Sequence, residues 1–178
     1  MGTDPCRIDP STWVRRFAPL IPQGGRVLDL ACGGGRHARL FLDLGHPVTA
    51  LDRDIGPAAT AATGAERIEA DLEDGSPWPL AERRFAGIII TNYLWRPLFP
   101  AILGALEPGG VLLYETFALG NEAYGRPRNP HHLLERGELL RLCVGLQIVA
   151  FEDGIERGRK VVQRIAALNG EAPVDLPD

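Results

Sequence analysis

The stretch "VLDLACGGGRHARLFLDLGHPVTALDRD", residues 27–54, decides how the chain folds. An apolar run at 26–31 predicts a β-strand, and a second run at 47–52 predicts another. Between them a cluster of glycines leads into residues 36–45, where apolar side chains recur at helical spacing and a glycine ends the series. That pattern predicts a helix. Strand, glycine turn, helix and strand together predict two parallel strands joined by a helical crossover.

The rest of the chain repeats this alternation of apolar runs and helical segments. A leading helix begins after Asp9 or Ser11, with Trp13, Phe17 and Leu20 on one face. Further strands are expected at 67–71, 85–93 and 111–117, further helices at 58–65, 96–110 and 131–145, and a closing antiparallel pair of strands at 146–154 and 160–168. We therefore expect an α/β fold with a mostly parallel, doubly wound sheet. We expect residues 1–170 to form one domain with a short N-terminal helix, and 171–178 to form a loose tail.

Composition narrows the function. The 178 residues are 45% hydrophobic and 24% charged, as in an ordinary globular domain, and no apolar run is long enough to span a membrane. The first ten residues lack a secretion signal, so we expect a cytoplasmic protein. Three cysteines (Cys6, Cys32 and Cys143) form no metal-binding pair, and no metal site is expected. A net charge of −4 without a dense basic stretch argues against a nucleic-acid partner.

Two common catalytic motifs are missing. Lys160 is the only lysine, and no Gly-Lys-Ser/Thr sequence exists, so a Walker phosphate loop is excluded. Neither serine, Ser11 nor Ser76, lies in a Gly-x-Ser-x-Gly elbow, so a serine hydrolase of that type is excluded.

The glycine cluster instead points to an adenosine-containing cofactor. Gly33, Gly35 and Ala38 satisfy the pattern Gly-x-Gly-x-x-Gly/Ala. Asp52 ends the second strand, where an acid can bind the hydroxyls of a ribose. NAD and S-adenosylmethionine both meet this description, and so does a simple tight turn with a capping aspartate.

Asp29 separates the two cofactors. It immediately precedes the glycine loop, where a carboxylate repels a diphosphate and attracts the ammonium and sulfonium of S-adenosylmethionine. The chain is too short for a separate substrate domain, and none of its three tyrosines is followed four residues later by a lysine, as in single-domain dehydrogenases. S-Adenosylmethionine is therefore favoured, and an NAD-dependent oxidoreductase is the less favoured alternative.

The motif "VLDLACGGGRHA" resembles the first motif of class I S-adenosylmethionine-dependent methyltransferases, with Ala31 in place of its first glycine. The resemblance continues through "LDRD", "ADLED", "FAGIIITNYL" and "LEPGGVLLYETF" and covers roughly residues 25–168. The segment "YETFALGNEAYGRPRNPHHLL" is most similar to small bacterial methyltransferases of the tellurite-resistance type. The resemblance implies a seven-stranded sheet whose last strand is antiparallel.

The same resemblance implies a set of cofactor-binding residues. Asp29 and the loop residues Ala31, Cys32, Gly33 and Gly35 would hold the methionine end of S-adenosylmethionine. The remaining members of the set are Asp52, which would bind the ribose, its neighbour Arg53, Asp71 and Leu72 beside the adenine, and Asn92 closing over the cofactor.

No catalytic residue can be assigned, but several residues are candidates to face the methyl acceptor. Tyr93 and Trp95 follow the fourth strand and can form the wall of an acceptor site, although aromatics there are also common in cores. Arg126 and Arg128, in the long loop 118–130, can bind an anion or can simply be solvated. His131 and His132, expected at the start of a helix, offer a base or are merely exposed.

We thus expect a methyltransferase acting on a small-molecule acceptor that is soft (S, Se or Te) or anionic. A methyltransferase acting on RNA or protein is one alternative, and a basic strip assembled in three dimensions would support it. A non-catalytic module that binds S-adenosylmethionine is another, which a pocket closed by Trp95 and Tyr124 would favour. The sequence leaves both a monomer and a homodimer open.

Overall fold

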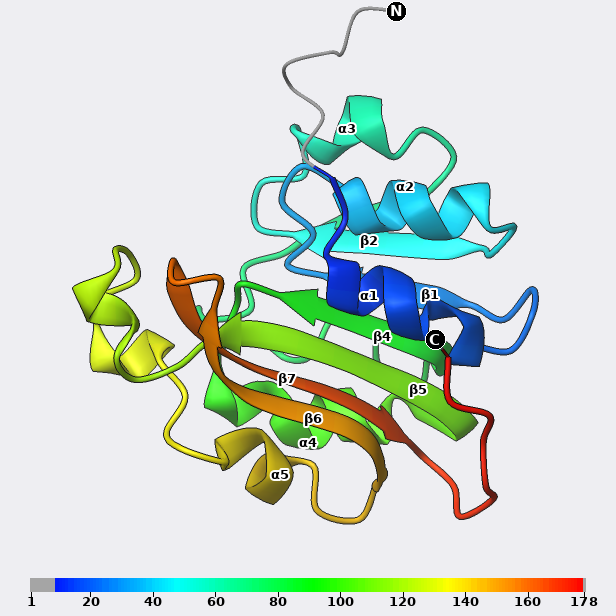
Figure 1. Cartoon of the computed structure of the whole chain (residues 1–178). Helices are drawn as coiled ribbons and strands as arrows, with labels where there is room; N and C mark the ends of the chain where they lie inside the picture. The colour runs from blue at the N-terminus through cyan, green and yellow to red at the C-terminus, as the bar shows by residue number, and fades with distance from the viewer. Residues whose placement is uncertain (1–8, 178) are drawn as a thin grey trace, which may run out of the picture.

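A computed structural model describes residues 9–177 and is drawn in Figure 1. The expectations about the first residues, including Cys6, lie outside the described residues. Within the described part of the chain, no helix has the length and apolarity needed to cross a membrane. Nor does any group of three or more histidine, cysteine, aspartate or glutamate side chains in residues 9–177 come together as a metal site would require.

All seven strands form a single sheet in the order β3-β2-β1-β4-β5-β7-β6. Their bounds are Val27–Leu30 (β1), Val48–Asp52 (β2), Glu66–Glu69 (β3), Phe85–Thr91 (β4), Leu106–Phe117 (β5), Gln147–Glu156 (β6) and Lys160–Leu168 (β7). Strands β1 to β5 pair in parallel, while β7 runs antiparallel to both of its neighbours, β5 and β6. This confirms the predicted seven-stranded, mostly parallel sheet with an antiparallel last strand.

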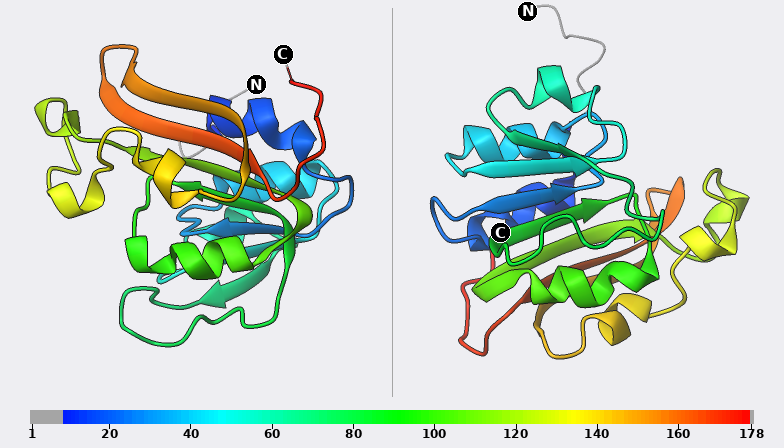
Figure 2. Two further views of the ribbon diagram at one scale, coloured as in Figure 1. Left: turned by 90° about the horizontal axis from the view of Figure 1, so that it is seen from below. Right: turned by 180° about the vertical axis from the view of Figure 1, so that it is seen from behind.

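Helices cover both faces of the sheet, as Figures 1 and 2 show. The α-helices are Thr12–Phe17 (α1), Arg36–Asp43 (α2), Ala58–Ala61 (α3), Phe99–Gly104 (α4) and Glu138–Leu142 (α5), and 3-10 helices lie at Ala18–Leu20, Arg96–Leu98, Asn121–Ala123 and Pro130–His132. Helices α1, α2 and α3 pack on one apolar core, and α4 and α5 pack on the other. The sheet is therefore doubly wound, as predicted.

The leading helix begins at the second of its two predicted caps. The Ser11 hydroxyl accepts a hydrogen bond from the Trp13 amide, and Trp13 and Phe17 are buried against the sheet. An N-cap serine satisfies an amide that the first turn leaves free, which explains why the helix begins there.

The predicted helix at 96–110 was wrong at its carboxyl end. Helix α4 ends at Gly104, and the residues "LEPGG" begin strand β5. Gly109 takes the left-handed conformation (φ 76°), and its amide donates to the Asn169 carbonyl at 2.7 Å. A Cβ on Gly110 would lie only 2.8 Å from the Glu107 carbonyl oxygen. These glycines thus form the tightly turned start of a strand and do not end a helix.

The predicted helix at 131–145 was also too long. A 3-10 turn occupies Pro130–His132, and α5 begins only at Glu138, after Gly137 in the left-handed conformation (φ 62°). His131 and His132 therefore lie on a separate turn instead of at a helix start. The closing residues 171–177 contain no helix or strand.

Candidate functional site

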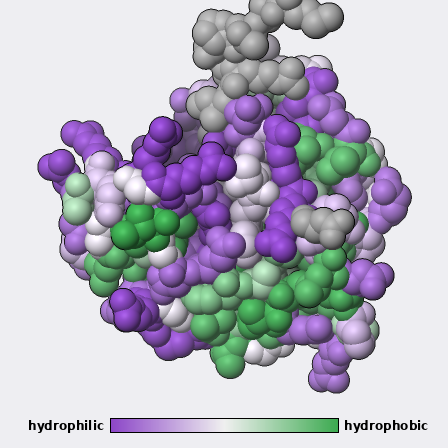
Figure 3. Space-filling view, viewed as in Figure 1, coloured by the Kyte–Doolittle hydropathy of each residue, from purple (hydrophilic) through white to green (hydrophobic). Residues whose placement is uncertain are grey.

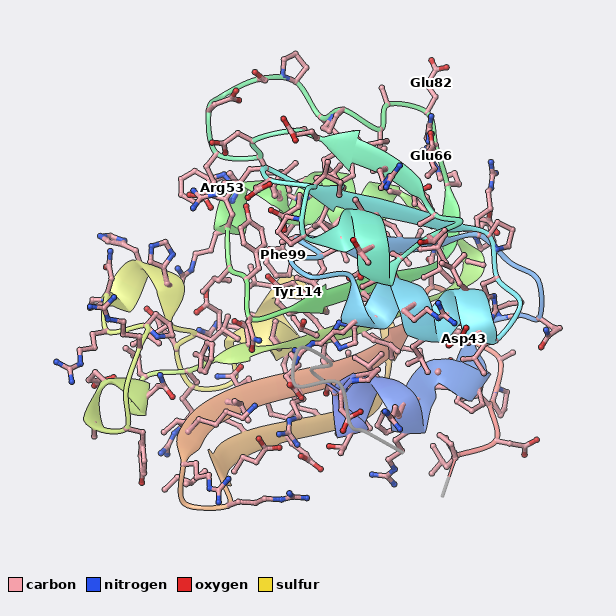
Figure 4. The ribbon with its side chains drawn as sticks, turned by 90° about the horizontal axis from the view of Figure 1, so that it is seen from above. Asp43, Arg53, Glu66, Glu82, Phe99 and Tyr114 are labelled. Carbon is pink, nitrogen blue, oxygen red and sulfur yellow. The ribbon has the colours of Figure 1, made fainter. Side chains whose placement is uncertain are left out.

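A hollow of about 520 Å³ lies at the carboxyl ends of the parallel strands. Parallel α/β sheets bind ligands at this edge, because the loops that leave neighbouring strands diverge there. Six residues predicted to bind the cofactor line it together: Ala31, Asp52, Arg53, Asp71, Leu72 and Asn92. Tyr93, predicted to face the acceptor, also lines it. In Figure 4 the labelled Arg53 lies at this edge.

The glycine loop follows β1 through a series of left-handed residues. Ala31, Gly33 and Gly35 have φ values of 53°, 52° and 75°. Ala31 is the one residue of the three with a Cβ, and it therefore carries strain that glycine would avoid. A Cβ on Gly35 would lie 3.2 Å from the Ala58 side chain, so close packing of α3 requires glycine there.

Asp52 holds this loop from the end of β2. Its Oδ2 accepts a hydrogen bond from the Gly33 amide at 2.8 Å, and its Oδ1 accepts one from the Asp54 amide at 3.1 Å. The carboxylate is half-buried and borders the hollow. It joins the glycine loop to the second strand at the position where the ribose was expected.

Asp29 does not line the hollow. It is 1% exposed, and its Oδ2 accepts the amide hydrogen of Ala38 at 2.8 Å, beneath the start of α2. Burial raises its pKa to about 7, an effect that the Ala38 hydrogen bond partly offsets. Asp29 therefore supports the loop from below, and its role toward a cofactor stays a prediction. Cys32, Gly33 and Gly35 likewise lie outside the lining of the hollow.

The hollow is predominantly acidic. Asp52, Asp71 and Glu73 contribute three carboxylates to its lining, and Arg53 contributes one guanidinium. A diphosphate placed among these groups would be repelled, whereas a sulfonium and an ammonium would be attracted. The charges present thus fit S-adenosylmethionine better than NAD, on residues that do not include Asp29.

Tyr93 brings a free hydroxyl to the same wall. Its Oη is buried and has no hydrogen-bond partner among the described residues. Burial, and then the nearby charge of Glu73, raises its pKa above the usual value. The Tyr114 hydroxyl donates to the Tyr93 carbonyl at 2.8 Å, and Tyr114 itself stacks on Phe99, as Figure 4 shows. The raised pKa keeps the Tyr93 hydroxyl neutral.

Sequence reasoning missed an ion-pair clamp beside the hollow. The guanidinium of Arg96 donates to both carboxylate oxygens of Glu138, at 2.6 and 2.9 Å, and to the carbonyls of His131 and Leu133. The residue between these two carbonyls, His132, lines the hollow. The clamp therefore fixes the backbone that presents His132, whereas the His131 side chain is exposed.

A buried polar network also went unpredicted. The Ser11 amide donates to Nε2 of His37 at 3.1 Å, and the Ser11 hydroxyl donates to Glu115 at 3.1 Å. Burial, and then the charge of Arg36, lowers the pKa of His37 to about 3, so its ring is neutral. The network fastens the start of α1 to α2 and β5 near the carboxyl ends of the strands.

The remaining predicted acceptor residues do not meet in the hollow. Trp95 and Arg128 do not line this hollow. Arg126 and Tyr124 line a second, neighbouring cleft. Trp95 and Tyr124 therefore do not close the first hollow, and the closed pocket that would have favoured a binding-only module is not seen there.

Comparisons with known proteins find methyltransferases both by sequence and by structure. No protein-family profile matches the chain. A ubiquinone biosynthesis O-methyltransferase from Nitrosococcus oceani is 32% identical over 131 residues, which cover 68% of this chain and 53% of that relative. The chain spans about half the length of the curated relatives it matches.

Solved structures share the fold at low sequence identity. A TehB-like S-adenosylmethionine-dependent methyltransferase from Corynebacterium glutamicum superposes with a TM-score of 0.64 at 21% identity, covering 87% of this chain and 85% of that one. The glycopeptide N-methyltransferase MtfA, solved with S-adenosylhomocysteine, gives 0.62 at 23% identity over 90% of each chain. The chain thus has the fold of the class I S-adenosylmethionine-dependent methyltransferases, and the predicted resemblance to that family, including its TehB-like members, is confirmed.

Proposed function

We propose that this protein transfers a methyl group from S-adenosylmethionine to a small-molecule acceptor. The observation that carries the proposal is the acidic hollow at the carboxyl ends of β1, β2 and β4, in a chain with the class I methyltransferase fold. Its charge suits a cationic cofactor, and its position is the one at which such sheets bind nucleosides.

The residues that line the hollow suggest how the cofactor is held. The backbone of 31–35 would receive the methionine end, with Asp29 supporting the loop from below. Asp52 would accept hydrogen bonds from the ribose hydroxyls, and Arg53 would lie beside it. Asp71 and Leu72 would flank the adenine, and Asn92 would close over the cofactor from the end of β4.

When bound, S-adenosylmethionine would supply an electrophilic methyl group to a lone pair of the acceptor. The chain's own task is to orient the acceptor and to exclude water. Phe117 and Leu94 line the hollow and would provide apolar walls for the acceptor. His132 lines the same hollow and can take the proton that a protonated acceptor releases.

A binding experiment tests the cofactor. S-Adenosylhomocysteine should raise the melting temperature and bind in calorimetry, because a ligand that binds only the folded state stabilises it. Asp52→Ala should weaken this binding about 10-fold or more, since charge-assisted hydrogen bonds to the ribose are lost. Asp43→Ala is the matched control, because Asp43 is an exposed aspartate that pairs with Arg39 on α2. Figure 4 labels it far from Arg53.

Binding of NAD instead of S-adenosylmethionine would contradict the proposal. If NAD at millimolar concentration stabilised the protein and S-adenosylmethionine did not, the cofactor assignment would be wrong. Once binding is established, labelled S-adenosylmethionine should be incubated with thiols, selenite, tellurite and small carboxylic acids. Methyl incorporation into one of these groups, and its loss in Asp52→Ala, would identify the acceptor class.

A further inference from the structure

A second cleft, of about 410 Å³, opens next to the cofactor hollow. It lies between the segment that follows β5 and the turn that joins β6 to β7, and Figures 1 and 2 show these two segments side by side. Its cationic lining comprises Arg126, Arg157, Arg159 and Lys160, and we call it the basic cleft. In Figure 3 hydrophilic residues dominate the upper left of the molecule, around the tip of this hairpin.

The positive charge of the basic cleft is largely unneutralised. Arg126, Arg157 and Arg159 form no ion pair with any residue in the range 9–177. Glu156 is the one acid of the lining, and it already pairs with Lys160 at 2.9 Å. Three free guanidinium groups in one cleft are unexpected in a chain whose net charge is −4. Such a cluster is suited to bind carboxylate or phosphate groups.

Buried hydrogen bonds hold the two sides of the cleft together. Asn121 is 1% exposed; its Oδ1 accepts the Val161 amide at 3.2 Å, and its Nδ2 donates to the Pro127 carbonyl at 3.3 Å. The hairpin turn is itself closed by a bond from the Arg159 amide to the Glu156 carbonyl at 2.9 Å. The arginines therefore project from anchored backbone, which reduces the entropy lost when they bind an anion.

The basic cleft and the cofactor hollow share a wall. Phe117 lines both of them. Pro127 lines the hollow, while its neighbour Arg126 lines the cleft. Tyr124, 44% exposed, adds a second aromatic surface to the cleft. A molecule anchored by an anionic group in the cleft can therefore extend over Phe117 toward the hollow.

We propose that the basic cleft binds the anionic group of the methyl acceptor, a carboxylate or a phosphate, while the apolar body of the acceptor lies against Phe117 and Tyr124. This inference rests on the proposed function. It selects an anionic acceptor over an uncharged soft one, and it replaces the predicted pair of Arg126 and Arg128 with Arg126 and the hairpin arginines.

The test uses probes whose binding does not depend on methyl transfer. Phenyl phosphate and benzoate should bind the full chain saturated with S-adenosylhomocysteine, and their affinities should fall as salt is raised. The triple variant Arg126→Gln, Arg157→Gln and Arg159→Gln should bind them about 10-fold or more weakly, because the loss of even one charge-assisted hydrogen bond to the anion costs about that factor. The preferred probe tells a carboxylate site from a phosphate site.

Matched controls separate the cleft from general charge effects. Arg128→Gln changes the same loop but lies outside the lining of the cleft, so it should leave probe affinity unchanged. Benzyl alcohol, which carries no anionic group, should bind the wild type and the triple variant with equal affinity. Unchanged melting temperature and S-adenosylhomocysteine affinity should show that the triple variant is folded.

Two results would overturn the inference. Equal affinity of phenyl phosphate and benzoate for the wild type and the triple variant would leave the cleft without an anion-binding role. If a short RNA bound much more tightly than both probes, and the triple variant no longer bound it, the cleft would be assigned to nucleic acid. If S-adenosylhomocysteine itself does not bind, the proposed function fails, which is a separate outcome.

Discussion

Replacing Arg96 by alanine should both destabilise the protein and disturb the hollow. The Arg96 guanidinium makes four hydrogen bonds, two to Glu138 and one each to the carbonyls of His131 and Leu133. Glu138 is only 7% exposed, so the substitution would leave its carboxylate buried without its cationic partner. The Glu135 amide, which also donates to Glu138, would remain as partial compensation.

The size of the effect follows from this geometry. Removing one partner of a fully buried ion pair costs about 3–5 kcal/mol. The Arg96 side chain is 35% exposed, and solvent screening therefore reduces the expected loss to about 2–3 kcal/mol. For a chain of this length, that corresponds to a fall in Tm of about 4–12 °C. The Tm of Arg96→Lys should lie between those of the wild type and Arg96→Ala, because lysine keeps the positive charge but lacks the planar guanidinium.

The dependence on pH gives a second readout. Burial acts to raise the pKa of Glu138, but its hydrogen bonds to Arg96 and to the Glu135 amide outweigh this, and its pKa is lowered from 4.5. A lowered folded-state pKa contributes stability above the unfolded value, and this contribution is lost as the pH falls through the folded value. The gap in unfolding free energy between wild type and Arg96→Ala should therefore narrow below about pH 4.5.

Urea unfolding at several pH values, with calorimetric Tm at neutral pH, measures both effects. Arg39→Ala is the control, since it removes an exposed arginine from an i,i+4 pair and should change Tm little. The reasoning would be refuted if Arg96→Ala lowered Tm by less than about 1 °C. A gap that stayed constant from neutral to acid pH would show that Glu138 is not the group involved.

Three further predictions concern the glycine loop and the residues beside it. Ala31→Gly should raise the unfolding free energy by about 0.5–1 kcal/mol, because relief of the left-handed strain exceeds the added freedom of the unfolded chain. The control Ala101→Gly, inside α4, should lower the unfolding free energy by about 1 kcal/mol. Tyr93→Phe should leave the protein as stable or slightly more stable in urea unfolding, because it removes a buried hydroxyl that has no hydrogen-bond partner among the described residues. The folded-state pKa of Asp29 is raised from 3.8 to about 7, so the folded protein holds this proton more tightly than the unfolded chain does. The wild type should therefore lose stability relative to Asp29→Asn as the pH rises across that interval. Parallel curves of stability against pH for the two proteins would contradict this.

The class of fold and much of the hollow could be predicted from the sequence, because both depend on short-range patterns. Apolar period and glycine position specify strands and crossovers locally, and parallel strands then bring their carboxyl ends to one edge. Residues that end such strands, among them Asp52 and Asn92, must therefore converge, and the structure places both in the lining of one hollow.

The start of β5 shows where local patterns fail. "LEPGG" looks like a helix stop, since proline and glycine both interrupt helices. Its actual conformation depends on Asn169, whose amide donates to the Gly110 carbonyl at 2.8 Å and whose carbonyl accepts from Gly109. No window of the sequence around 106–110 contains that partner.

The sequence alone thus determined the order of the elements, the doubly wound sheet and two of the acids that border the hollow, Asp52 and Asp71, because local periodicity and the geometry of parallel strands suffice for these. Only the tertiary structure decided that Arg96 holds Glu138, and that Arg126 meets Arg157 and Arg159 in one cleft. These groupings bring together residues 30 or more positions apart, and they depend on how the whole chain packs.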